Sequence, residues 1–334
     1  MTVYDERDGE VREGAITCGG CGFRYPVING IPRMLPGRLQ GELLGYHGDF
    51  FARRKDEFAI PAGDGVQDAS DSLKKKTIKS FSFQWNVFSE MFEEYVKHWE
   101  SYIPAGADKE FFSGKTGLDA GCGFGRHIYR AAKNGAEMVG IDLSEAVEAA
   151  YKNTSGLENV HIVQGDIYNP PLRYGVFDFI YSLGVLHHLP DPEKGFDSIA
   201  GLLGHGQRIF IWCYDNEKPR KNRMYERIRK ITTGMDFGTL YAFCYIAALG
   251  VRLGLNLPAS ALKKLGLFGG RKFPYDYYNN FPLRVLHADL FDVFSVPSTR
   301  YYDQPELELW FRSRGLNVLE SGHKVSGWTV LGEK

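Results

Sequence analysis

The sequence predicts an α/β protein in three layers, with a mostly parallel sheet between two layers of helices. Between residues 116 and 213, short apolar runs typical of buried strands alternate with segments of helical pattern. Strands that alternate with helices form parallel sheets covered on both faces. The length of 334 residues and the hydrophobic content of 43% fit one large globular domain with an appendage.

The first 36 residues predict a small β-hairpin. The segment CGGCGFRYPVINGIPRML contains a turn at Cys18 and Cys21, a short β segment and a second turn at Asn29-Gly30. Residues 37–79 carry many charges and glycines with little periodicity, and we interpret them as a linker with short helices.

From Ser80 to Tyr102 the spacing predicts an amphipathic helix, because apolar residues recur every four positions. The alternating region follows. Its predicted strands are 116–120, 137–141, 160–164, 177–182 and 208–213, and its predicted helices are 126–134, 144–153 and 192–203. Residues 214–300 then predict a helical insertion rich in Tyr and Phe. A helix at 305–314 and strands at 316–321 and 327–331 return to the main domain, which comprises 80–213 plus 301–334.

The strongest chemical signal is LDAGCGFGRH, residues 118–127, in which apolar residues lead into Asp119 and then three glycines. Glycines let a ligand approach the main chain closely, and a following helix start offers free N–H groups. The GxGxG spacing differs from the GxGxxG of dinucleotide-binding enzymes. Asp119 beside the loop would balance a cationic ligand but repel a pyrophosphate.

Two further acids follow predicted strands. Asp142 ends a strand 21 positions after Gly121, where a carboxylate can accept both hydroxyls of a ribose; its alternative role is to cap the next helix. Asp166 lies two residues past the third strand, where it can accept from an adenine amino group or form a turn. A fourth segment, FDFIYSLGVLHHLPDP, ends at the same edge of the sheet, where open α/β sheets bind ligands.

These four segments together resemble class I S-adenosylmethionine-dependent methyltransferases, and most closely the subgroup whose fourth segment reads like GVLHHLPDP. The resemblance implies a Rossmann-like sheet of seven strands with a reversed final hairpin. It also implies S-adenosylmethionine as cofactor: the glycine loop and Asp119 at its methionine part, Asp142 at the ribose, and Asp166 at the adenine amino group. The cofactor-binding residues expected are Asp119, Ala120, Gly121, Cys122, Gly123, Asp142, Leu143, Asp166, Ile167, Ser182 and Leu183.

Methyl transfer needs in-line positioning of the nucleophile and sometimes a base, because the sulfonium already makes the methyl group electrophilic. His187 and His188 are the candidate bases, with an ordinary pKa near 6.5. The alternative is that both histidines only pack and hydrogen-bond at a helix start.

The N-terminal segment resembles half of a Trm112-like zinc ribbon. A structural zinc needs four ligands, and only Cys18 and Cys21 match, so no metal is assigned and a zinc-free hairpin packed by Tyr25, Val27 and Ile31 is the alternative.

The insertion is basic, with 14 Lys or Arg against seven Asp or Glu, and seven of the bases fall between Lys218 and Lys230. An apolar run, 237–251, follows, and it is shorter than the roughly 20 residues of a spanning helix. This pattern indicates either peripheral contact with an anionic membrane or a lipid-like substrate, or else a solvated helix before a core helix. The acceptor-binding residues expected are aromatic: Trp85, Tyr275, Tyr278, Tyr301 and Tyr302.

We therefore expect methyl transfer to an O, N or C atom of a small-molecule or lipid-like acceptor. The competing hypothesis is an inactive protein of the same fold that binds a partner through the hairpin and the basic insertion; an NAD-dependent dehydrogenase is a third. The net charge of −1 does not favour nucleic acid, and the N-terminus lacks a signal-peptide pattern, so a cytoplasmic location is expected.

Overall fold

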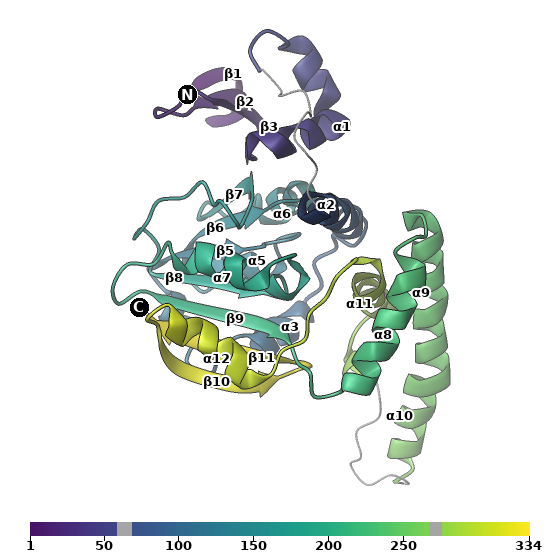
Figure 1. Cartoon of the computed structure of the whole chain (residues 1–334). Coiled ribbons are helices and arrows are strands. Elements are labelled where there is room, and N and C mark those ends of the chain that lie inside the picture. The colour runs from purple at the N-terminus through teal and green to yellow at the C-terminus, as the bar shows by residue number, and fades with distance from the viewer. Residues whose placement is uncertain (59–68, 267–275) are drawn as a thin grey trace.

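The computed structural model describes residues 1–58, 69–266 and 276–334, and its centre is one mixed sheet (Figure 1). Within these described ranges the sheet has 11 strands, in the order β1-β2-β3-β4-β7-β6-β5-β8-β9-β11-β10. The predicted count of seven is wrong for the whole sheet, because the N-terminal segment joins it and adds four strands. The strands are β1 (Thr2–Arg7), β2 (Glu10–Thr17), β3 (Arg24–Ile28), β4 (Ile31–Met34), β5 (Thr116–Ala120), β6 (Glu137–Asp142), β7 (Val160–Gly165), β8 (Phe179–Leu183), β9 (Arg208–Tyr214), β10 (Asn317–Lys324) and β11 (Gly327–Glu333).

The direction of the strands changes at both ends of the sheet. From β4 to β9 each neighbouring pair is parallel. At one end β11 runs antiparallel to β9 and β10 antiparallel to β11, so the predicted reversed hairpin is present. At the other end β1, β2, β3 and β4 pair in antiparallel order.

Helices cover both faces of the central strands, as the alternating pattern predicts. Successive residues of a strand point to opposite faces. Ile209 and Ile211 of β9 therefore join a core with Phe196 and Phe311, whereas Phe210 of the same strand joins the opposite core. One layer contains α7 (Pro192–Ala200) and α12 (Gln304–Ser313), and the other contains α3 (Tyr95–Tyr102), α4 (Lys109–Phe112), α5 (Arg126–Lys133) and α6 (Ala146–Thr154).

The single helix predicted from Ser80 to Tyr102 is instead two helices, α2 (Ala69–Val87) and α3. The two halves of the apolar pattern pack against different partners. Phe83 of α2 stacks on Phe237 and Phe291 of the insertion, whereas Trp99 of α3 packs on Phe112 and beside the sheet. One straight helix cannot contact both surfaces, so the chain turns between α2 and α3.

The insertion is helical, as predicted, and lies along one side of the molecule (Figure 1). It comprises α8 (Pro219–Thr232), α9 (Phe237–Val251), a π-helical segment (Arg252–Asn256), α10 (Leu257–Lys264), a 3₁₀ turn (Asp276–Asn280) and α11 (Leu283–Ser295). The run from Phe237 to Lys264 is one 28-residue helix that is long and apolar enough to cross a membrane by length and composition. Our expectation of a run too short to span is wrong, because the helix continues through the π-helical segment.

The N-terminal unit of β1–β4 and α1 (Gly37–Arg53) extends the sheet at β7. The predicted hairpin turn is present between β3 and β4, with φ of 57° at Asn29 and 82° at Gly30. β4 then pairs in parallel with β7, so that Arg33 lies opposite Gln164.

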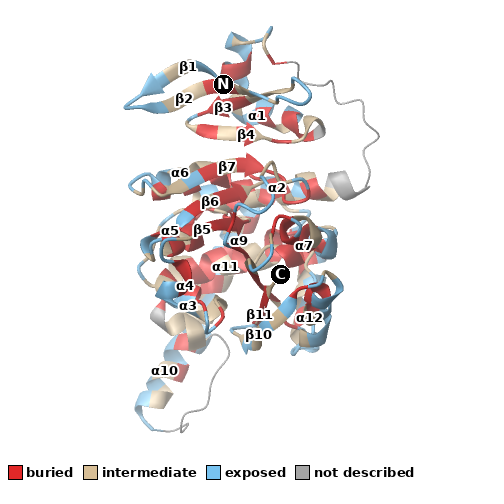
Figure 2. Ribbon diagram, turned by 90° about the vertical axis from the view of Figure 1, so that its left-hand side faces the viewer, coloured by how far each residue is buried: buried red, intermediate tan, exposed pale blue. Residues whose placement is uncertain are grey.

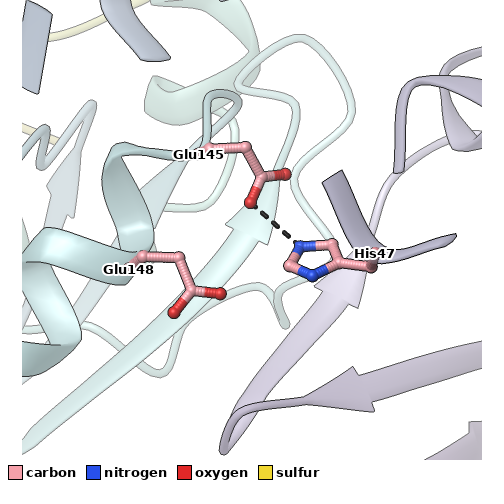
Figure 3. Close-up of side chains that lie close together, drawn as sticks. All are labelled: His47, Glu145 and Glu148. Atoms are coloured by element: carbon pink, nitrogen blue, oxygen red, sulfur yellow. Dashed lines mark hydrogen bonds and ion pairs between the residues drawn. The ribbon is translucent and has the colours of Figure 1, made fainter. Parts of the chain in front are cut away.

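A buried ionic network fastens this unit to α6. The Arg33 guanidinium, which has no solvent exposure, contacts Glu145 at 3.1 Å and also pairs with Glu148. His47 of α1 lies 3.0 Å from Glu145 (Figure 3). The two carboxylates and the imidazole have the spacing of a cation site. Arg33 already supplies the compensating charge, so the group is explained as a structural ion-pair network.

Candidate functional site

A large cavity opens beyond the carboxyl ends of β5, β6 and β8, the edge at which open α/β sheets bind ligands. Its volume is about 870 Å³. One side consists of the glycine loop after β5 and the strand ends. The opposite side consists of α2, α8 and α11, so the helical insertion closes the space that the sheet leaves open.

The glycine loop after β5 leaves space that side chains would occupy if they replaced its glycines. Gly121 has φ of 93°, and a Cβ added there would lie 2.4 Å from Val185 Cγ2. The N–H groups of Gly121 and Cys122 both donate to the carbonyl of Ile141, at 2.8 and 3.1 Å. Gly125, at φ of 91°, precedes α5 directly. The backbone is thus held open in a left-handed turn that only glycine adopts without strain.

Asp142 lies at the end of β6 and organises the loop around it. Its Oδ2 accepts from the N–H of Gly123 at 3.0 Å, and its Oδ1 accepts from the N–H and hydroxyl of Ser144 at 2.8 and 2.7 Å. Burial raises the pKa of this carboxyl, and the hydrogen bonds from Ser144 and Gly123 oppose the rise. Asp142 also lines the cavity. A carboxylate has about four acceptor positions, so one remains for a ligand hydroxyl.

Asp166 lines the cavity too, but it is paired. Lys74 of α2 contacts its Oδ2 at 3.1 Å, and the Lys74 ammonium lies 3.9 Å from the ring centre of Tyr168. The Tyr168 N–H donates to the other carboxylate oxygen at 3.0 Å. This ion pair holds α2 over the part of the cavity where adenine is expected. An adenine amino group bound there would share Asp166 with the Lys74 ammonium.

The remaining predicted cofactor residues divide into two groups. Cys122, Leu143, Ile167 and Leu183 line the cavity together with Gly121 and Gly123. Asp119, Ala120 and Ser182 lie behind the loop instead: the Ser182 hydroxyl donates to the Ala120 carbonyl at 2.8 Å. Burial raises the pKa of Asp119 to about 8, so this group is largely protonated at neutral pH.

The two histidines occupy different places. His187 is buried and is absent from the cavity lining, and its Nδ1 accepts from the Tyr214 N–H at 3.4 Å. Burial, together with the neighbouring His188 and Arg229, holds its pKa well below the ordinary value. His188 does line the cavity, 3.8 Å from Asp292, and burial lowers its pKa to about 3. Both imidazoles are therefore neutral at physiological pH.

Two acids of α11 that the sequence did not single out face the same cavity. Asp289 accepts from the Tyr278 hydroxyl at 2.8 Å, and Asp292 accepts from the Tyr214 hydroxyl at 3.3 Å. Burial raises the pKa of each carboxyl to about 6, while the nearby charge of Arg126 opposes the rise. The available signal was their spacing of three in an otherwise apolar helix, which places both on one face.

The predicted aromatic residues also divide. Trp85, Tyr278 and Tyr301 line the cavity; Trp85 stacks on Phe124 at 4.9 Å. Tyr302 lies in the core against Trp310, with ring centres 5.0 Å apart. Tyr275 lies outside the described residues.

Cys18 and Cys21 are free thiols in the turn between β2 and β3. Hydrogen bonds from the backbone of Cys21 and Gly20 lower the pKa of Cys18. Among the residues that the structure describes, no further histidine, cysteine or acid groups with them at metal-ligand spacing.

Residues 118–211 match a family model described as a methyltransferase domain. A probable chloroplastic tocopherol O-methyltransferase of Oryza sativa subsp. japonica is 32% identical over 130 residues, which are 36% of this chain and 35% of the relative. A tRNA U34 carboxymethyltransferase of Psychromonas ingrahamii is 41% identical over 99 residues (28% and 30%). A ubiquinone biosynthesis O-methyltransferase of Coxiella burnetii is 33% identical over 100 residues (29% and 43%).

This chain therefore matches less than half of the length of these relatives. A solved S-adenosylmethionine-dependent methyltransferase of Aquifex aeolicus is 14% identical, covers 80% of this chain and 98% of its own, and has a TM-score of 0.42, too loose a likeness to carry an argument. These comparisons do not confirm the resemblance of the first 36 residues to a Trm112-like zinc ribbon. The family match covers the loop, Asp142 and Asp166, and it supports S-adenosylmethionine as the cofactor of a methyltransferase domain.

Proposed function

We propose that this protein transfers a methyl group from S-adenosylmethionine to a small organic acceptor held under the helical insertion. The observation that carries the proposal is the continuity of the cavity. Asp142 and the glycine loop line one part of it, and the tyrosines and acids of the insertion line another. A donor and an acceptor bound in one space can meet in line, which is the main requirement of the reaction.

S-adenosylmethionine supplies an electrophilic methyl group when it is bound. The residues of the chain then position it. The open acceptor position of Asp142 suits a ribose hydroxyl, and the glycine loop leaves room for the amino-acid portion. Leu143 and Ile167, which line the cavity together with Asp166, offer apolar contacts for adenine.

We assign the role of base to the acids of α11 rather than to His187, which lies outside the cavity lining, or to His188. A base works best when its pKa lies near the operating pH, and the carboxyls of Asp289 and Asp292 are closer to neutrality than the imidazole of His188. Asp289, oriented by Tyr278, would accept the proton of an acceptor hydroxyl or amine. The relatives include a probable tocopherol O-methyltransferase and a ubiquinone biosynthesis O-methyltransferase, which favours an acceptor oxygen.

The test of the donor site is Asp142→Asn, measured by calorimetry with S-adenosylmethionine. We expect the affinity to fall by about 1–3 kcal/mol, the value of hydrogen bonds to a charged group. The matched control is Asp178→Asn, because Asp178 also accepts from a backbone N–H, that of Thr116, but at the opposite end of β5. Equal affinities for wild type and Asp142→Asn would refute the assignment.

Turnover needs a separate measurement. Extracts incubated with enzyme and donor are searched by mass spectrometry for a product that has gained one methyl group. Tight binding of the donor without any such product would favour the competing hypothesis, a binding protein that keeps the fold without the reaction.

A further inference from the structure

An unusual surface lies on the outer side of the insertion, away from the reaction site. The helix from Phe237 to Lys264 buries little of its most apolar stretch, only 22% of the residues. Its side chains are exposed along one stripe: Ile246 is 68% exposed, Leu253 61% and Leu257 54%. Positions three, four and seven apart fall on the same face of a helix. Ile246 and Leu253, seven positions apart, therefore share a face, and together with Leu257 of α10 they form an apolar ridge that α10 carries beyond the body of the protein (Figure 2).

Exposed basic residues lie on α8, which packs on α11 as α9 does. Arg223, Arg227 and Lys230 of α8 all point to solvent, and among the described residues none of them forms an ion pair. Met224 and Ile231, at 49% and 69% exposure, lie on the same face of α8. The result is an amphipathic helix with cations around an apolar strip.

The basic face and the apolar ridge belong to one surface. Tyr225 of α8 and Phe243 of α9 both pack on Phe294 of α11, with ring centres 5.7 and 6.2 Å away. Figure 1 shows both helices along the outside of the molecule. We call the exposed residues of these two helices and of α10 the α8–α10 face.

We propose that the α8–α10 face docks on an anionic membrane surface, with the ridge of Ile246, Leu253 and Leu257 inserted among lipids and Arg223, Arg227 and Lys230 against their headgroups. Interfacial helices combine these two features, an apolar face and a cationic rim. The charge favours an anionic lipid surface, because residues 214–300 carry 14 Lys or Arg against seven Asp or Glu and part of this excess is exposed on α8.

The packing favours lying on the membrane over crossing it. Leu240, Cys244 and Ala248 of α9 are fully buried in the core shared with α11. A spanning orientation would strip these contacts away, whereas surface docking keeps them. Among the described residues of this helix, those of the ridge lie exposed and can meet lipid while that core stays intact.

The same face leads to the cavity. Met224 is both half-exposed on α8 and part of the cavity lining, beside Tyr225 and Lys221. An amphiphilic acceptor drawn from the membrane would enter along this helix. This route rests on the proposed function, whereas the docking itself does not.

The test is cosedimentation of the full chain with vesicles of phosphatidylcholine, with and without phosphatidylglycerol. We expect binding only to the anionic vesicles, and a decrease as salt is added. Changing Arg223, Arg227 and Lys230 together to Gln should weaken binding by at least about tenfold. The matched control removes three exposed charges elsewhere, at Lys97, Lys109 and Lys152, and should bind like the wild type.

A second pair of variants separates insertion from electrostatic adsorption. Ile246→Ser with Leu253→Ser should lose binding, while Leu309→Ser with Leu319→Ser, on α12 and β10 and 63% and 51% exposed, should keep it. All four variants should bind S-adenosylmethionine as the wild type does, so a failure of docking is distinguishable from a failure of the proposed function.

Three outcomes would overturn the proposal. The first is equal binding by the Ile246/Leu253 variant and its control. The second is protein that resists extraction from the vesicles with alkaline carbonate, which indicates a spanning helix. The third is a dimer by light scattering, dispersed by the ridge variant, in protein that ignores both kinds of vesicle.

Discussion

At the scale of the residue, the site contains acids whose chemistry depends on burial. Asp289 and Asp292 are carried by α11, an otherwise largely apolar helix, and each contacts a tyrosine hydroxyl. Burial raises the pKa of each to about 6. Both groups are therefore ionised at neutral pH and protonated in mild acid. Because the two interact, the titration belongs to the pair rather than to one residue.

A pH profile tests the role of this pair. If Asp289 accepts a proton during methyl transfer, kcat/KM should rise with pH through about 6 and then level off. Asp289→Asn should lower kcat by roughly 10²–10⁴-fold, the usual contribution of a general base. Tyr278→Phe removes a hydrogen bond that lowers the pKa, so its acid limb should move to higher pH while most of the rate remains. An unmoved limb in Tyr278→Phe would contradict the assignment.

The residues expected to bind the methyl donor could be predicted from the sequence far better than those on the acceptor side of the cavity. Gly121, Asp142 and Asp166 follow strands of one motif region, so their meeting at the sheet edge was predictable. Asp289 and Arg126 come together only because the insertion folds back over the sheet. Tyr302 was placed in the acceptor pocket on composition alone, and its ring packs in the core instead.

At the scale of the element, two features require glycine in the turn from β5 to α5: the left-handed backbone and the close approach of a neighbouring side chain. Gly121 has φ of 93°, and a Cβ there meets Val185 Cγ2 at 2.4 Å, an approach too close for any side chain. Gly175 has a similar φ of 74°, but nothing lies within 4 Å of its added Cβ. The two positions therefore separate backbone strain from steric overlap.

Alanine at the two positions gives the matched test. Gly175→Ala should cost about 1–2 kcal/mol of stability, the strain of a left-handed residue with a side chain. Gly121→Ala should cost about 1–3 kcal/mol more, from overpacking, and should also abolish binding of S-adenosylmethionine. Urea unfolding and calorimetry measure the two effects. Similar losses of stability in both variants, with donor binding retained by Gly121→Ala, would show that Val185 simply moves aside.

The elements that were predicted well are those specified by local pattern. Each of the five predicted strands between residues 116 and 213 matches an observed strand to within two residues at either end, because each is a buried apolar run bounded by polar turns. The prediction of a single helix from Ser80 to Tyr102 is wrong, because α2 and α3 pack against different cores. Lys74, which fastens α2 to Asp166, lay in a segment without periodicity and gave no signal.

At the scale of the whole molecule, the N-terminal unit is an extension of the central sheet rather than a separate appendage. The parallel pairing of β4 with β7 places Arg33 beside Gln164 and within reach of Glu145. Glu145 is adjacent to Ser144, a partner of Asp142, and its N–H donates to Ser82 of α2. The ionic network thus connects the hairpin, the loop after β6 and the helix that covers the cavity. A pattern of local periodicity cannot reveal such a pairing, since it joins residues 131 positions apart.

The network should therefore stabilise the whole chain. Burial alone would raise the pKa of Glu145, but the hydrogen bond from His47 and the charge of Arg33 bring it below the ordinary value. A group with a lowered pKa contributes stability above its unfolded pKa, about 4.3 for Glu, and that contribution is lost as the pH falls through the folded pKa. Acid should weaken the attachment of the N-terminal unit.

Arg33→Met tests this arrangement, because it leaves two carboxylates without their buried cation. We expect a loss of about 3–5 kcal/mol in the free energy of unfolding near neutral pH. The loss should shrink in acid, where protonation of Glu145 removes an unpaired charge. Arg7→Met is the matched control, since Arg7 pairs with Asp5 in a position where its side chain is 74% exposed, and such pairs contribute little. Glu148→Gln offers a milder variant if Arg33→Met does not fold. Equal urea midpoints for Arg33→Met and Arg7→Met would show that the network does not stabilise the attachment of the N-terminal unit to α6.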